Sequence, residues 1–373
     1  MKTKTSQTNP LVSGPLALAR RDALEAAITL RLPVWFQLWV SVMLTWLTGL
    51  APSASGGQPA RPGGEARAFW LMMAALVLGG AAVLTGNRVL LGGLALVYGM
   101  RSFSSVVGHH MTHLAKVLPG PAWISRLVYD VASALLLLPR FAVYQLSHRR
   151  HHAYTAGPDD PDQRFIAHLG ARFDGPLRFF LTVIEPRFHL LFLRARLGAA
   201  LLDGPLWRRA IPVGFHAAMA MWASPQAILT WAFFAGLLYQ VASLTQWSSE
   251  HLWGKRPASG KAVEIATAVT YGRLLLPDPA SRGLWLRLPL YALARLLLVT
   301  GDLINHDLHH VGRGPWADHA YIRTRLILEG RIALRQTVTL RGMFEAAFAS
   351  ALSGGGGPAQ PPRAMGGQRM LEM

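Results

Sequence analysis

The sequence contains no cysteine, and this absence removes several classes of functional site at once. Without thiolates the chain cannot form disulfides, cysteine-type zinc sites, iron–sulfur clusters or a cysteine nucleophile. Any metal that the protein binds must therefore be held by His, Asp or Glu, and 14 histidines are available.

Charged residues are also scarce, because only 15% of the 373 residues are Asp, Glu, Lys or Arg, whereas 51% are hydrophobic. The mean hydropathy is accordingly positive, at +0.28. A soluble protein of this length needs more charge to cover its surface. One polytopic membrane domain is therefore favoured over two soluble domains.

Acidic residues are the rarer charged class, with 19 Asp and Glu against 37 Lys and Arg and a formal net charge of +18. Together with the apolar runs, this excess indicates contact with anionic membrane lipids and basic cytoplasmic segments. Nucleic-acid binding is the alternative interpretation of a basic chain. Since the basic residues flank apolar segments and form no separate arm or recognition helix, we expect no nucleic-acid partner.

Apolar runs divide the chain into three parts. We expect a basic N-terminal segment at 1–31, a membrane domain at 32–350 and a disordered Gly- and Pro-rich tail at 351–373. The expected fold is all-α: a polytopic membrane bundle of about four to five spans, capped by a cytoplasmic helical domain that carries a metal site. Its candidate helices are 32–50, 69–85, 89–107, the hairpin 210–223 and 227–246, and an interfacial or bundle-facing helix at 284–300.

Nine of the 14 histidines fall in three windows of five residues: HHMTH at 109–113, HRRHH at 148–152 and HDLHH at 306–310. Spacings of three and four residues place side chains on one face of a helix, so we expect each HxxHH helix to offer three imidazoles to one point. Two metal ions need about eight ligands, and imidazole suits iron, zinc and copper alike. The windows supply His109, His113, His148, His151, His152, His306, His309 and His310.

Topology must bring the three windows to one side of the membrane. Between 152 and 306 the hairpin supplies two crossings, which return the chain to the side it left. The segments 114–209 and 251–287 are rich in Arg, so the positive-inside rule makes that side cytoplasmic. The number of crossings before residue 109 stays open, since three full spans there would leave the basic N-terminus outside.

The order HxxxH, then HxxHH about 35 residues later, then HxxHH after further spans closely resembles the membrane fatty acid desaturase family. The segment NHDLHHVGRGPW at 305–316 is similar to the third histidine box of that family, and the likeness covers roughly residues 69–330. The resemblance implies two iron ions held by the eight histidines, with O₂ as co-substrate. By analogy with acyl-CoA desaturases, His251 would be a ninth ligand, although its distance from the third box is longer here.

A shell made only of histidines needs carboxylates that hold the outer ring nitrogens. Candidates for this role are Asp159, Asp160, Asp162, Glu250, Asp302 and Asp307. A simple turn is an equally good interpretation of the segment GPDDPD at 157–162. His110 stands where many family members carry Asp or Glu, so we expect it to support the ligands, with direct ligation as the alternative.

The resemblance implies an oxidoreductase that abstracts hydrogen from a fatty acyl chain, presented as a free fatty acid, acyl-CoA, acyl-carrier protein or phospholipid. Desaturation is favoured; hydroxylation and oxidative decarboxylation to a terminal alkene begin with the same step, and ring oxidation of carotenoids is more distant. No dinucleotide or haem motif is present, so electrons would come from a ferredoxin- or cytochrome-type donor. We expect an inner or plasma membrane location with the metals facing the cytoplasm.

A membrane metal transporter is the alternative from another functional class. A transporter should hold its ligands near the middle of its spans, whereas these histidines follow the ends of apolar runs.

Overall fold

The computed structural model describes residues 11–59, 65–114, 117–118, 120–163, 181, 183–253, 256–310, 316–330 and 335–353. Within these ranges the chain is helical, apart from two isolated β-bridges and one parallel pair of two-residue strands, β1 (Gly272–Arg273) and β2 (Gln336–Thr337). The prediction of a mainly helical protein is therefore confirmed. Most of the expected C-terminal tail, from residue 354 on, lies outside the described residues.

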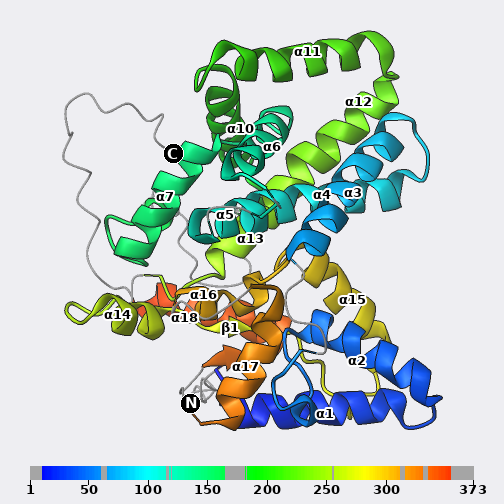
Figure 1. Cartoon of the computed structure of the whole chain (residues 1–373), viewed down its shortest axis with the longest axis vertical. Coiled ribbons are helices and arrows are strands. Elements are labelled where there is room, and N and C mark those ends of the chain that lie inside the picture. Colours follow the sequence, from blue (N-terminus) through cyan, green and yellow to red (C-terminus); the bar gives the residue numbers. More distant parts are fainter. Residues whose placement is uncertain are drawn as a thin grey trace, which may run out of the picture.

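The helices form two layers in Figure 1, and the upper layer contains the long apolar helices. It consists of α3 (Glu65–Leu84), α4 (Val89–Ser102), α6 (Ala122–Leu135), α7 (Phe141–Tyr154), α10 (Pro186–Leu201), α11 (Leu206–Trp222) and α12 (Pro225–Trp231). Two of these helices continue through a π-helical segment. Helix α4 runs through η2 (Phe103–Val107) into α5 (Gly108–Leu114), and α12 runs through η3 (Ala232–Leu238) into α13 (Tyr239–Ser248).

The lower layer of Figure 1 brings the N-terminal helices together with the C-terminal part of the chain. It consists of α1 (Gly14–Thr29), α2 (Val34–Thr48), η1 (Ser53–Ser55), α14 (Ala262–Val269), α15 (Leu284–Leu297), η4 (Leu303–Asn305), α16 (His306–His310), η5 (Trp316–Asp318), α17 (His319–Leu328) and α18 (Leu340–Ser353). Helix α2 packs against α1 and α15. The first apolar run of the sequence thus belongs to the lower layer.

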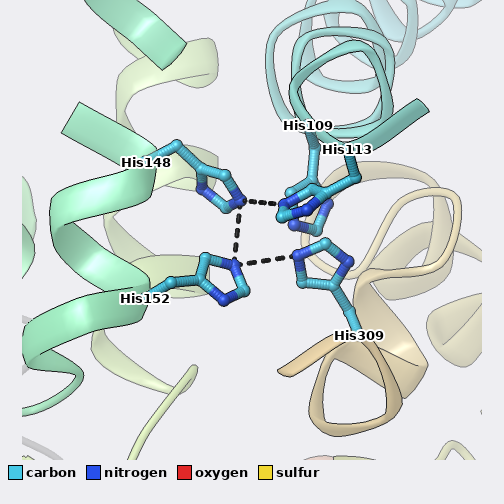
Figure 2. Close-up of side chains that lie close together, drawn as sticks. All are labelled: His109, His113, His148, His152 and His309. Atoms are coloured by element: carbon cyan, nitrogen blue, oxygen red, sulfur yellow. Dashed lines mark hydrogen bonds between the residues drawn. The ribbon is translucent and has the colours of Figure 1, made fainter. Parts of the chain in front are cut away.

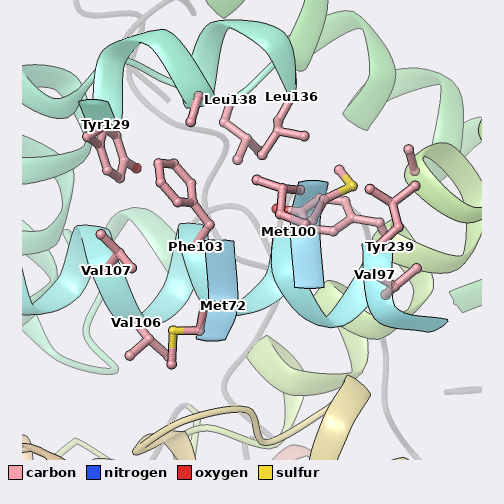
Figure 3. Packing of buried hydrophobic residues seen from close by; sticks show 14 of the residues in the cluster. Met72, Val97, Met100, Phe103, Val106, Val107, Tyr129, Leu136, Leu138 and Tyr239 are labelled. Atoms are coloured by element: carbon pink, nitrogen blue, oxygen red, sulfur yellow. The ribbon is translucent and has the colours of Figure 1, made fainter. Parts of the chain in front are cut away.

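Glycines allow α3 and α4 to pack with their backbones in close contact. A Cβ atom on Gly79 would lie 2.5 Å from the backbone nitrogen of Leu96, and one on Gly99 would lie 2.6 Å from that of Leu76. Small residues of this kind are typical of helix pairs inside membranes. Beside this hairpin, residues from α4, α6 and α13 pack into the main core, part of which Figure 3 shows.

Within the part of the chain that the structure describes, three helical segments are long and apolar enough to cross a membrane: Arg67–Leu84, Val89–Leu114 and Pro225–Ser248. The expected count of four to five spans is therefore not confirmed. Helix α2 is apolar but shorter, and α11 is not among the three candidates. Of the two crossings expected between residues 152 and 306, only the second is therefore a candidate span. Counting crossings no longer shows that the histidine windows lie on one side, and the positions of the histidines in the structure show whether they meet.

Several arginines have an internal role that the net charge did not indicate. Arg101, Arg196, Arg208 and Arg295 are buried, and each donates hydrogen bonds to backbone carbonyl groups. Arg196 illustrates the principle, because it binds carbonyl groups left free at the end of α6 and within η3. Part of the arginine excess therefore joins helix ends inside the protein and does not face lipid.

Candidate metal centre

The first two histidine windows lie on α5 and α7. His109 and His113 end the long helix Val89–Leu114, directly after the π-helical segment η2. A π-helical turn holds more residues than an α-helical turn and so changes the direction in which the next side chains point. This places the α5 histidines toward α7, where His148 and His151 are buried.

Five histidines from three helices form a first cluster, here called group A: His109, His113, His148, His152 and His309. The Nε2 atom of His148 lies 3.0 Å from that of His113 and 3.0 Å from that of His152. The Nε2 atoms of His152 and His309 are 2.9 Å apart. Figure 2 shows these rings converging from α5, α7 and α16.

Four buried histidines form a second cluster, here called group B: His151, His251, His306 and His310. The Nε2 atoms of His151 and His251 are 3.1 Å apart, and those of His306 and His310 are 3.0 Å apart. His251 follows α13 and is fixed by an isolated β-bridge to Thr270. The two groups adjoin, because the rings of His152 and His310 stack with their centroids 4.3 Å apart.

The two HxxHH helices divide their histidines between the groups, contrary to the expectation of three imidazoles at one point. On α7 the pair four residues apart, His148 and His152, belongs to group A, while His151 belongs to group B. On α16 the assignment is reversed: His306 and His310 belong to group B, and His309 to group A. A rotation of about 100° per residue turns the intervening histidine away from the pair, so each helix contacts both groups.

The geometry of both groups fits metal binding. Ligands bound about 2.1 Å from one ion at nearly right angles lie about 3 Å apart, which matches the separations of the Nε2 atoms. Metal-binding histidines must also be neutral. Burial, reinforced by neighbouring histidine charges, holds the pKa of His148, His309 and His310 well below the usual value. Which histidines bind metal nevertheless stays a prediction.

The carboxylates of the 157–162 turn contact the outer nitrogen of His151. Both oxygens of Asp160 lie 3.0 Å from Nδ1 of His151, and Oδ2 of Asp162 lies 3.4 Å from it. Asp160 also accepts hydrogen bonds from the backbone N–H groups of Ala156 and Asp162. The segment therefore forms a turn and also contacts the outer nitrogen of His151, so the two interpretations of its sequence are compatible. Burial lowers the pKa of His151, but Asp160 and Asp162 outweigh it and raise this pKa to about 9.

His110 lies outside both groups, beside the buried carboxylate of Asp302. Its Nε2 atom is 3.1 Å from Oδ2 of Asp302, and its ring stacks on Trp316 with the centroids 4.6 Å apart. The same oxygen lies 3.9 Å from Nδ1 of His109 and 3.7 Å from that of His319. Burial raises the pKa of Asp302, but His110 and His319 outweigh it, so the carboxyl is held ionised. The sequence alone gave neither His319 nor Trp316 a role at this carboxylate.

The remaining carboxylate candidates have three different surroundings. Asp159 is exposed on the 157–162 turn. Asp307 pairs with the buried guanidinium of Arg323, which also donates to Asn305 and thereby holds the start of α16 in place. Glu250 has its Oε1 atom 3.1 Å from Nε2 of His306. The sequence offered no signal for Arg323, which is distant in the chain from every window except the third.

A cavity of about 220 Å³ adjoins the two groups. His109, His148, His151 and His306 are among the residues that line it. The rest of the lining is largely apolar and aromatic and includes Tyr129, Leu138, Val143, Tyr144, Phe192, Tyr239 and Trp247. An elongated apolar molecule in this space would lie against the histidine groups.

The comparison with known families matches the fatty acid desaturase family model to residues 87–260. This region includes the windows on α5 and α7 as well as His251, whereas α16 lies beyond it. Comparisons with curated proteins and with solved structures give no match.

Proposed function

We propose that the chain, whose residues 87–260 match the fatty acid desaturase family model, is a membrane di-iron oxidoreductase that desaturates a fatty acyl chain. Two ferrous ions would be held by the nine histidines of groups A and B. The observation that carries the proposal is the meeting of these histidines beside one largely apolar cavity.

The bound irons would supply the redox chemistry, in which O₂, two electrons and two protons take up two hydrogen atoms from adjacent carbons, so that one double bond and two waters are formed. The protein's own residues would bind and orient the acyl chain. Aromatic side chains such as Tyr144, Phe192 and Trp247 line the cavity and can hold a methylene segment against the histidine groups. Because the substrate is apolar, its fit to this wall supplies the positioning and excludes bulk water.

The proposed reaction needs two partners, an acyl substrate and a protein that donates electrons. A free fatty acid, an acyl-CoA, an acyl-carrier protein and a phospholipid all offer the same methylene chain. A ferredoxin- or cytochrome-type protein would deliver the electrons, since the sequence carries no cofactor-binding motif of its own.

Membrane placement with the histidines facing the cytoplasm is part of the proposal. It is supported by the three candidate spans and by the apolar residues that α2 and α15 expose, among them Trp35, Trp39, Trp285 and Leu286. In this arrangement α2 lies in the interface and does not cross, which would keep the basic N-terminus inside. The positive-inside rule then agrees with the α3–α4 hairpin as the first pair of crossings. Helix α11 would cross with Pro225–Ser248 as the second pair, which returns His251 to the side of His109.

Desaturation is favoured because it is the activity from which the family takes its description. Hydroxylation and oxidative decarboxylation to a terminal alkene begin with the same hydrogen abstraction and differ only in the later steps of the reaction. A metal transporter is disfavoured because the histidines gather at helix ends into two compact groups and do not extend along the length of the spans.

The test is expression in a bacterial host with a supplied reductase system, followed by mass spectrometry of the lipids and of the headspace hydrocarbons. New double bonds would support desaturation, whereas hydroxyl groups or terminal alkenes would replace it with one of the alternatives. His148→Ala should abolish the product. His216→Ala is a matched control, because the Nδ1 atom of His216 bonds the Pro212 carbonyl and its ring lies outside both groups. A product that persists in His148→Ala, or far fewer than two irons per chain, would overturn the proposal.

A further inference from the structure

Glu250 differs from Asp160 in the histidine nitrogen that it faces. Asp160 contacts Nδ1 of His151, whose other nitrogen, Nε2, points toward His251 within group B. Glu250 instead places Oε1 3.1 Å from Nε2 of His306, and this same nitrogen lies 3.0 Å from Nε2 of His310. Asp160 therefore supports a ligand from outside the group, while Glu250 reaches the side on which a metal would bind.

Glu250 borders group B through its contact with His306, and its carboxylate is not among the atoms that define the group. Its 3.1 Å separation from His306 equals the spacings of 2.9 to 3.1 Å between the Nε2 atoms within the two groups. Atoms bound about 2.1 Å from one ion at nearly right angles are about 3 Å apart. We propose that Glu250 binds the group B ion directly through a carboxylate oxygen, next to His151, His251, His306 and His310. This inference rests on the proposed function only in requiring a second metal ion.

The donor count supports this assignment. Group A offers five imidazoles, whereas group B offers four. With the carboxylate of Glu250, each ion would have five protein ligands. The two ions would nevertheless differ, because one would bind only nitrogen donors and the other would also bind a charged oxygen donor.

Among the described residues, the arginine that forms an ion pair with Glu250 is Arg273, and this pair is long. The side chain of Glu250 is 5% exposed, and a buried carboxylate needs compensation. Gln246 donates a hydrogen bond to Oε1, but it is neutral. Arg273 is 3.9 Å away, and its two terminal nitrogens donate to the backbone carbonyl groups of Gln246 and Leu303. A metal ion in group B would therefore be the closest positive charge to Glu250.

Glu250 also lines the cavity together with His306. The proposed oxygen ligand thus lies on the side from which small molecules reach the group. If the side chain is shortened to alanine, a formate ion entering from the cavity can take the place of the carboxylate. This access makes chemical rescue a specific test of direct ligation.

The experiment compares the full-length protein with Glu250→Gln, Glu250→Ala and the control Asp160→Asn, each loaded anaerobically with ⁵⁷Fe²⁺. Iron content and Mössbauer spectra are recorded, and thermal unfolding verifies the fold. The wild type should bind two irons with distinguishable spectra. Glu250→Gln should lose affinity at one site by more than the roughly 10–100-fold that loss of an outer partner causes. Asp160→Asn should keep both spectral components and show at most that smaller loss.

Formate added to Glu250→Ala should restore the second iron and its spectrum, and it should have no effect on Asp160→Asn. The inference is overturned if both Glu250 variants keep two irons with wild-type spectra. It is also overturned if Glu250→Ala loses one iron and formate fails to restore it. A wild-type protein with fewer than two irons would instead refute the dimetal site itself, so the two failures are distinguishable.

Discussion

Metal binding to group B should depend on pH more strongly than metal binding to group A. In the metal-free protein, Asp160 and Asp162 outweigh the effect of burial and raise the pKa of His151 to about 9. His151 is therefore protonated at neutral pH, and its proton must leave before Nε2 can bind a metal. In group A, burial and neighbouring histidines lower the pKa of His152 to about 3, and they hold that of His148 well below its usual value.

The size of the effect comes from competition between proton and metal. Each pH unit below a pKa of about 9 should lower the group B affinity about tenfold, so the affinity at pH 7 should be about 100-fold lower than its limiting value well above the pKa. This corresponds to about 2.7 kcal/mol. Because the metal replaces the proton, the affinity rises with pH and levels off above the pKa of His151.

Anaerobic isothermal titration with Fe²⁺ between pH 7 and 9, in buffers of different ionisation enthalpy, measures both the affinity and the protons released. One proton should leave with the group B ion at pH 7, and close to none should leave at pH values above 9. Asp160→Asn should weaken this dependence, because it removes the carboxylate that contributes most to raising the pKa of His151. Equal pH dependence of both ions, or an unchanged slope in Asp160→Asn, would refute the reasoning.

Three further predictions concern stability. Gly99→Ala should destabilise the protein by about 1–3 kcal/mol, because the new methyl group would lie 2.6 Å from the Leu76 backbone. The control Gly214→Ala meets no atom within 4 Å and should be nearly neutral. Thermal unfolding in detergent compares the stability of the two variants. Arg323→Leu should cost about 3–5 kcal/mol, since it leaves the buried carboxylate of Asp307 without its partner, and it should also lower the iron content measured by elemental analysis. Removal of iron by a chelator should lower the stability by about 2.7 kcal/mol for each ion lost, relative to protein with free iron at 100 times the dissociation constant of that site, and an unchanged melting temperature would contradict metal binding to the folded state.

The histidine windows could be found in the sequence because their spacing is local. A repeat of three and four residues needs only helical geometry to bring His148, His151 and His152 to neighbouring positions. His251 lies far from the windows in the chain, so family resemblance alone indicated it. Its place in group B depends on how α13 ends and on the bridge to Thr270.

The division of the two HxxHH windows between two metal positions could not be predicted in the same way. It depends on which face of α7 meets α16, and helix packing decides this through contacts far apart in the chain. The π-helical segments η2 and η3 also have no residue pattern that marks them. The same holds for Arg101 and Arg196, because the sequence shows their charge but does not show that their partners are backbone carbonyls at helix ends.

The reversed division on α7 and α16 has a consequence for the site as a whole. Helix α7 would give two ligands to the group A ion and one to the group B ion, and α16 would give the opposite. A shift of either helix would therefore disturb both ions. Since α7 belongs to the upper layer and α16 to the lower layer, two bound metals would also join the layers across the cavity that the substrate is proposed to enter. Metal content, layer packing and substrate position should therefore change together when either helix is perturbed.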